Sequence, residues 1–240
     1  MHIVTFNLLA FFHFFISAAE ATSVRTGATN LTALTARATG CHDYLIIDSR
    51  GTGEPQGRSS QFSGMIQKTF DGLPDGIGIS NPYPASSAPN SPASGSVWLR
   101  TYLRQAVAMC PQQNYALLGW SQGAAVTWTA LGGMKKDDPL HHAIKAVVVV
   151  GDPFHVPNVR GNVDQDGHGQ TAGAQGKMRG GNSDATIAEW AADGKVLDIC
   201  FSGDPVCNQW GDRPADHGRY GGSGEVQTLG AQFLIQHLRR

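Results

Sequence analysis

One stretch decides the fold of this chain: YALLGWSQGAAVTWTA, residues 115–130. Residues 115–118 are typical of a short buried strand, and residues 124–130 have the small and apolar composition that begins a helix. Between them, residues 119–123 have the pattern G-x-S-x-G around Ser121. A serine at a sharp turn from strand to helix forms a nucleophile elbow, so this stretch predicts an α/β fold with a reactive serine.

The residue types in the elbow follow from its chemistry. The turn has to be sharp if the Ser121 hydroxyl is to project from the edge of the sheet. Gly119 and Gly123 lack Cβ atoms, so the strand and the helix can pack closely around the serine. The backbone N–H of Gln122 then faces the helix N-terminus, where an oxyanion can be stabilised. The alternative is a glycine-flanked turn whose serine takes no part in a reaction.

Apolar runs alternate with amphipathic segments along the rest of the chain. Further strands are predicted at residues 44–47, 77–79, 146–150 and 196–201. Apolar residues within 99–110 and 226–238 recur with the spacing of core-facing helices. The alternation predicts a mostly parallel, doubly wound sheet with helices on both faces, which is a three-layer α/β/α sandwich. Residues 80–96, rich in Ser, Pro, Ala and Asn, are predicted to form a long loop.

A serine at such an elbow works with an acid and then a histidine, in that order along the chain. Asp152 and Asp204 both follow predicted strands and both lie in a Gly-Asp-Pro turn, so the local pattern does not separate them. Asp204 also lies between Cys200 and Cys207, and a disulfide closing that segment would fix the direction of its carboxylate. We therefore predict that Asp204 is the acid and that Asp152 is an ordinary turn residue.

Three histidines late in the chain are candidates for the base. His237 falls on the predicted last helix, and His168 precedes Asp204 in a loop rich in Gly, Asn and Asp. His217 follows Asp204 by 13 residues, in the loop just before the last helix, where an imidazole can reach the serine. We predict that His217 is the base, the alternative being a solvated loop histidine.

The N-terminal region differs from the rest of the chain in composition. A short apolar run followed by Ala19-Glu20-Ala21 predicts a signal peptide over residues 1–21. The alternative, a membrane anchor, is disfavoured because the run is short and interrupted by polar residues. Residues 22–39, with the glycosylation sequon Asn30-Leu31-Thr32, are predicted to be a disordered leader or pro-segment. One domain over residues 40–240 then follows, and the protein is expected to be secreted and extracellular.

Composition and cysteine count narrow the classes of function. Charged residues are 15% of the chain and the formal net charge is -1, which indicates neither a nucleic-acid partner nor a strongly basic membrane patch. No spacing of Cys and His suggests a zinc site. A serine, an acid and a histidine need neither a metal nor an organic cofactor for acyl transfer, so none is expected. Four cysteines behind a signal peptide predict two disulfides, and spacing alone leaves all three connectivities open.

Four ordered motifs together resemble the cutinase family of fungal and bacterial serine esterases, especially its cutinase-like branch. They are DSRGTGE at 48–54, the elbow at 119–123, the segment 200–207 with its Gly-Asp-Pro turn, and His217 followed by VQTLG at 226–230. The match covers nearly all of residues 41–240. The usual elbow of the family has Tyr where this chain has Trp120, a position that should face away from the hydroxyl and have little effect.

The resemblance implies a small α/β hydrolase without a lid, in which Ser121, Asp204 and His217 are the nucleophile, the acid and the base. It implies an oxyanion hole formed by the backbone N–H of Gln122 and by Thr52, which would otherwise only shape its turn. Two disulfides are also implied: Cys41–Cys110 and Cys200–Cys207.

The expected function is hydrolysis of carboxylic esters, such as cutin-like polyesters and short-to-medium acyl esters, through an acyl-enzyme. The alternative is an acetylxylan esterase acting on acetylated plant polysaccharide, because the loop between Asp204 and His217 is polar. A non-catalytic lipid- or surface-binding protein is less favoured because the triad is complete. The expected partner is a polymeric or lipid-like ester, with no nucleic acid and no stable membrane insertion, and the chain is expected to be a monomer.

Overall fold

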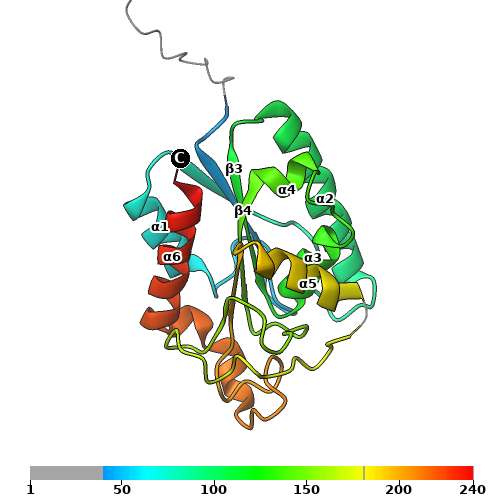
Figure 1. The fold of residues 1–240 in the computed structure, drawn as a ribbon, viewed down its shortest axis with the longest axis vertical. Coiled ribbons are helices and arrows are strands. Elements are labelled where there is room, and N and C mark those ends of the chain that lie inside the picture. The colour runs from blue at the N-terminus through cyan, green and yellow to red at the C-terminus, as the bar shows by residue number, and fades with distance from the viewer. Residues whose placement is uncertain (1–39, 181, 240) are drawn as a thin grey trace, which may run out of the picture. The chain divides into compact units, whose positions relative to one another are not determined.

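Within residues 40–180 and 182–239, which the computed structural model describes, six strands form one sheet in which every neighbouring pair is parallel (Figure 1). The order across the sheet is β2-β1-β3-β4-β6-β5. The strands are β1 (Tyr44–Ser49), β2 (Gly76–Ser80), β3 (Asn114–Trp120), β4 (Ile144–Val150), β5 (Asn162–Val163) and β6 (Val196–Ile199). The carboxyl ends of parallel strands lie at one edge, so β1, β3 and β6 deliver the loops of the site to the same edge.

Helices cover both faces of the sheet (Figure 1). One face carries α1 (Ser63–Gly72) and α6 (Gly224–Leu238). The other face carries α2 (Ser91–Met109), α3 (Gln122–Leu131), α4 (Pro139–Ala143) and α5 (Asn182–Ala192). Two short 3₁₀ helices, η1 (Pro214–Gly218) and η2 (Tyr220–Gly222), lie between β6 and α6. This arrangement confirms the predicted three-layer α/β/α sandwich.

Strand β1 shows how the hydrophobic core is divided between the two faces. Leu45 and Ile47 pack in the core beneath α2 and α3, whereas Tyr44 and Ile46 pack in the core beneath α1 and α6. Since successive side chains of a strand point to opposite faces, a strand covered on both sides needs an apolar residue at every position. The valines of β4 are shared between the two cores in the same alternating way.

All the predicted strands are present, with ends that differ by a few residues. The run predicted at 146–150 begins at Ile144, and the run predicted at 196–201 ends at Ile199. The two-residue strand β5 was not predicted, and neither were α1, α4 and α5. Their apolar repeats are too short or too mixed with polar residues to be read from periodicity alone.

The predicted loop at 80–96 is wrong at its C-terminal end, because α2 begins at Ser91. The buried side of the first turns of α2 is made of Ser91, Gly95 and Ser96, so it has no apolar stripe to read. Small residues are needed here because the helix packs closely on its neighbours. A Cβ atom at Gly95 would lie 2.9 Å from side-chain atoms of both Tyr83 and Val126.

Both disulfides join the pairs that the family resemblance implied. Cys41–Cys110 connects the residues before β1 to the C-cap of α2, and Cys200–Cys207 closes the loop after β6. None of the described helices combines the length and the apolar composition needed to cross a bilayer. The predicted signal peptide at 1–21 and leader at 22–39, with its sequon, lie outside the described residues.

The close packing at Gly95 predicts an effect on stability. Gly95→Val should lower the free energy of unfolding by about 1–3 kcal/mol, because the added side chain collides with Tyr83 and Val126. Ala93→Val, on the exposed side of the same helix, is the matched control and should cost only the small helix-propensity difference. Urea denaturation of the two variants measures this, and equal losses would contradict the packing argument.

Candidate active site

Ser121 occupies the sharp turn between β3 and α3. Its backbone has φ 53° and ψ -116°, a conformation that residues with a side chain rarely adopt. A Cβ atom at Gly119 would lie 2.6 Å from the carbonyl oxygen of Gly123, and one at Gly123 would lie 2.0 Å from the carbonyl oxygen of Ser49. A side chain at Gly119 would push β3 and α3 apart, and one at Gly123 would push α3 away from the end of β1, so both glycines are needed for the close packing predicted at the elbow.

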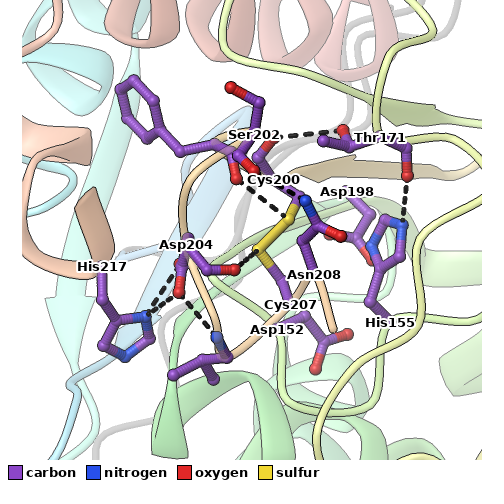
Figure 2. The surroundings of a disulfide bond; sticks show 12 residues. Asp152, His155, Thr171, Asp198, Cys200, Ser202, Asp204, Cys207, Asn208 and His217 are labelled. Atoms are coloured by element: carbon purple, nitrogen blue, oxygen red, sulfur yellow. Dashed lines mark hydrogen bonds and ion pairs between the residues drawn. A yellow bond between two sulfur atoms is a disulfide. The ribbon is translucent and has the colours of Figure 1, made fainter. Parts of the chain in front are cut away.

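The structure brings Ser121, His217 and Asp204 into one hydrogen-bonded chain. His217 Nε2 lies 2.8 Å from Ser121 Oγ, and its Nδ1 lies 2.9 Å from Oδ2 of Asp204. The His217 side chain, on η1, is 22% exposed, whereas the Asp204 side chain is fully buried. Figure 2 shows the His217 ring with its Nδ1 turned toward the Asp204 carboxylate. This geometry allows a proton of the Ser121 hydroxyl to pass to the imidazole.

Three further groups hold the Asp204 carboxylate in place. The backbone N–H of Val206 donates to Oδ1 at 2.8 Å, and the phenol of Tyr220 donates to Oδ2 at 2.6 Å. The Cys200–Cys207 disulfide closes the loop that carries the aspartate. The loop was predicted to aim this carboxylate, but no pattern in the sequence pointed to Tyr220.

Thr52 and Gln122 meet beside the elbow. The Gln122 side-chain amide donates to Thr52 Oγ1 at 3.0 Å and to the carbonyl oxygen of Ser86 at 2.9 Å, while its own oxygen accepts from Ser91 Oγ at 3.1 Å. Because Thr52 Oγ1 accepts from Gln122, its hydroxyl proton is available for another acceptor. The backbone N–H of Gln122, at the first residue of α3, has no carbonyl one turn earlier in the helix to bind.

The loop that carries Thr52 is held from both sides. Arg50 is fully buried, and its guanidinium donates to the carbonyl oxygens of Glu54, at 2.8 Å, and of Tyr83. The Glu54 carboxylate accepts from the backbone N–H of Gly51 at 2.9 Å. These charge-assisted bonds fix the loop before any substrate arrives.

Trp120 contacts the backbone of His217, the predicted base. Its indole Nε1 donates to the carbonyl oxygen of His217 at 2.9 Å, and the two rings lie 5.5 Å apart between centroids. Gly51 makes room for the indole, since a Cβ atom there would lie 2.3 Å from the ring. Little effect was expected at this elbow position, but the structure gives Trp120 a direct contact with the residue that carries the imidazole.

The other acid candidate, Asp152, is bound elsewhere. Its carboxylate accepts from Trp128 Nε1 at 2.6 Å and from the backbone N–H of Phe154 at 2.8 Å. The second bond is that of a turn aspartate, as predicted, but the side chain is also fully buried. Asp152 belongs to a buried polar cluster that sequence reasoning did not identify.

This cluster contains a second Asp–His pair. His155 Nδ1 lies 2.7 Å from Oδ2 of Asp198, and both side chains are fully buried. On the other ring edge, His155 Nε2 lies 3.1 Å from the carbonyl oxygen of Thr171, whose hydroxyl donates to the carbonyl oxygen of Cys200. In Figure 2 this pair lies on the opposite side of the disulfide from Asp204. No serine hydroxyl of the described residues contacts the Nε2 side of the His155 ring. The pair instead joins the loop after β4, which carries His155, to β6, which carries Asp198.

The cluster shifts the pKa values of its members. Burial lowers the pKa of His155, but the charge and the hydrogen bond of Asp198 outweigh that effect and raise it to about 8. Burial and then the charge of Asp198 raise the pKa of Asp152 to about 7. Both groups therefore hold protons more tightly in the folded chain than in an unfolded one.

The two remaining histidine candidates lie apart from the elbow. His168 is exposed in the loop after β5. His237 is a residue of the α6 surface whose ring nitrogens lie 2.8 Å from the carbonyl oxygen of Phe233 and 3.0 Å from that of Gly194. Among the described residues, no group of three or more His, Cys, Asp or Glu side chains is placed to hold a metal ion.

Comparisons with known proteins agree on one family for this chain. The family model described as Cutinase matches residues 40–238. A "Cutinase" of Kineococcus radiotolerans is 29% identical over 214 residues, which cover 83% of this chain and 63% of that protein. "Carboxylesterase Culp1" of Mycobacterium tuberculosis is 28% identical over 207 residues, which cover 85% of each chain. The chain thus spans less than two thirds of the Kineococcus protein but most of the mycobacterial one.

A solved structure agrees with these relatives. A cutinase-like protein from Cryptococcus sp. superimposes with a TM-score of 0.76 at 32% identity, covering 85% of this chain and 98% of that chain. The agreement extends over nearly the whole of that protein, so the two chains share one overall fold.

The buried His155–Asp198 pair predicts a pH dependence of stability. Because the pKa of His155 is raised to about 8, its contribution is complete below about pH 6.5 and is lost as the pH rises through 8. The free energy of unfolding should therefore fall by on the order of 2 kcal/mol over that range. Urea denaturation at about pH 6 and about pH 9 spans the titration of His155 and measures the change.

Two variants isolate the contribution of this pair. His155→Gln should reduce the pH-dependent difference, because the amide carries no titrating proton. The part that remains is assigned to Asp152, whose raised pKa of about 7 gives a loss of the same sign. His142→Gln, which changes an exposed histidine, should keep the wild-type difference. A wild-type difference that persists unchanged in His155→Gln would contradict the assignment.

Proposed function

The chain belongs to the cutinase family of ester hydrolases, and on this premise we propose that it hydrolyses carboxylic esters through an acyl-enzyme formed on Ser121. The observation that carries the proposal is the hydrogen-bonded chain from Ser121 through His217 to Asp204. A serine hydroxyl is a weak nucleophile by itself, and a neutral imidazole within hydrogen-bond reach is the group that activates it.

In the acylation step, Ser121 Oγ attacks the ester carbonyl carbon while its proton moves to His217 Nε2. The electron pair of the carbonyl bond moves to the oxygen and forms a tetrahedral oxyanion. The backbone N–H of Gln122 and the hydroxyl of Thr52 donate to that oxygen. Asp204 stabilises the imidazolium and keeps Nδ1 as the protonated nitrogen in the resting site.

Collapse of this intermediate breaks the bond to the alcohol, which leaves with the proton held by His217. Water then repeats the same sequence: His217 removes its proton, the hydroxide attacks the acyl carbon, and the proton returns to Ser121 as the acid is released. The net reaction is hydrolysis of one ester bond: the protons that move come from the Ser121 hydroxyl and from water, and His217 carries each of them.

The exposure of the site favours an open, lidless groove. Ser121, Gln122 and His217 are only partly buried, and Thr52 is exposed. Because these groups are open to solvent on one side, a long acyl chain would bury few methylene groups, each worth about 0.8 kcal/mol when fully buried. Short and medium acyl esters, including those at the surface of a cutin-like polyester, are therefore the proposed substrates.

One observation favours acetylated polysaccharide as a second candidate substrate. The loop between Asp204 and His217 presents Asp212 and Arg213 to solvent, with side chains 85% and 58% exposed. Polar groups suit a sugar better than an acyl chain. The same loop also carries Trp210, which is 71% exposed and offers an apolar or a sugar-stacking surface.

We also propose that the protein acts outside the cell as a monomer. The two disulfides support an oxidising compartment, because such bonds are rare where thiols are kept reduced.

Kinetics on a series of p-nitrophenyl esters test the proposal. Rates on the acetate and butyrate should rise hyperbolically with concentration, without a jump at the solubility limit, and should exceed rates on longer esters and acetyl release from acetylated xylan. Ser121→Ala is the control and should lower kcat by about four orders of magnitude without loss of fold. A sharp activation at the emulsion threshold would show a lid, and faster deacetylation of xylan would favour the second candidate.

A further inference from the structure

The phenol of Tyr220 has one hydroxyl hydrogen and donates it in a hydrogen bond to Asp204, the proposed acid of the triad. Its hydroxyl lies 2.6 Å from Oδ2 of Asp204 and accepts from the backbone N–H of Phe201 at 3.2 Å. Cys207 Sγ, at 3.5 Å, is part of a disulfide and has no proton to offer. The hydroxyl is therefore a donor to the carboxylate and an acceptor from the backbone.

Tyr220 is itself held rigidly. Its side chain is fully buried, and its ring packs edge-on against Phe201 with 4.9 Å between centroids. Its carbonyl oxygen accepts from Gln227 on α6 at 2.9 Å, and the next backbone N–H, of Gly221, donates to Gln61 at 2.9 Å. The phenol therefore has a fixed position from which it can orient Asp204.

The phenol also stays protonated. Burial, followed by the negative charge of Asp204, raises the pKa of Tyr220 well above its usual value. A neutral phenol can donate at every pH at which His217 acts as a base.

We propose that Tyr220 is a positioning residue that orients the Asp204 carboxylate and moderates the charge it presents to His217. Two donors share Oδ2: the phenol at 2.6 Å and His217 Nδ1 at 2.9 Å. The phenol draws on the same negative charge that stabilises the imidazolium, so it limits how strongly His217 retains a proton. This inference rests on the proposed function, because it concerns the acid of the same triad.

The other charged groups near this pair have partners of their own. Asp198 on β6 is paired with His155, at 2.7 Å. Asp216 on η1 is bound by Arg213 at 2.9 Å and by Arg219 at 2.8 Å. A change confined to the Tyr220 hydroxyl leaves these pairs intact, so a shift in the pH profile would report on Asp204 and His217.

The test compares Tyr220→Phe with Tyr44→Phe. Tyr44 is the control, since it is also fully buried and its phenol also donates to an oxygen, the carbonyl of Leu73, at the far end of the sheet. Tyr220→Phe in addition removes the acceptor of the Phe201 N–H. Active sites are counted by titration with a p-nitrophenyl alkylphosphonate, so that unfolded or inactive protein does not enter kcat.

Tyr220→Phe should lower kcat about ten-fold with KM unchanged, because the buried phenol does not touch substrate. The low-pH side of its kcat/KM profile, the acid limb, should move toward higher pH by roughly half a unit to one unit. Without the phenol, the full charge of Asp204 acts on His217 and favours its protonated form. Tyr44→Phe should keep both the wild-type kcat and the wild-type limb. An unmoved limb in Tyr220→Phe would overturn the proposal.

A second substitution covers the case in which Tyr220→Phe does not fold. Replacing Tyr220 with 3-fluorotyrosine keeps the ring and the hydroxyl but makes the phenol a stronger donor. The acid limb should then move toward lower pH, and a limb that stays in place or moves upward would overturn the proposal. Failure of the proposed function would look different, because the wild-type protein would then neither hydrolyse esters nor react with the phosphonate.

Discussion

The close packing of β3 against α3 holds Ser121 at a backbone φ of 53°, and the rest of the site is arranged around that turn. The turn exists because Gly119 and Gly123 leave room for the chain to fold back, where any Cβ atom would strike backbone at 2.6 Å or less. It aims the serine hydroxyl at His217 and places the first N–H of α3 where the proposed oxyanion hole needs a donor. Both features depend on the strained backbone of Ser121, which the packing of β3 and α3 maintains.

Much of this could be predicted from sequence because the signals are local. The elbow, the buried strands and the disulfide-bracketed Asp204 depend on residues within a few positions of each other. What could not be predicted depends on segments that meet only in the folded chain: Tyr220 reaching Asp204 and Trp120 reaching His217. The family resemblance placed Thr52 beside Gln122, but it did not predict the hydrogen bond from the Gln122 side-chain amide to Thr52. The start of α2 was missed for a different reason, since its buried side is made of small residues.

The region around the Cys200–Cys207 disulfide contains two Asp–His pairs with different roles. Asp204 and His217 lead to a partly exposed serine, whereas Asp198 and His155 are fully buried and lead to a backbone carbonyl (Figure 2). An aspartate beside a histidine is therefore not a sufficient sign of a catalytic site. The group on the second ring nitrogen separates the two pairs, because only a hydroxyl there can become a nucleophile.

The central claim, that His217 makes Ser121 the nucleophile, is tested most directly by covalent labelling. The protein is treated with a p-nitrophenyl alkylphosphonate, digested and mapped by tandem mass spectrometry. The account predicts a single phosphonyl group on each chain, attached to Ser121, with loss of ester hydrolysis in step with labelling. A label on a different residue, or hydrolysis that continues when Ser121 is fully labelled, would contradict it.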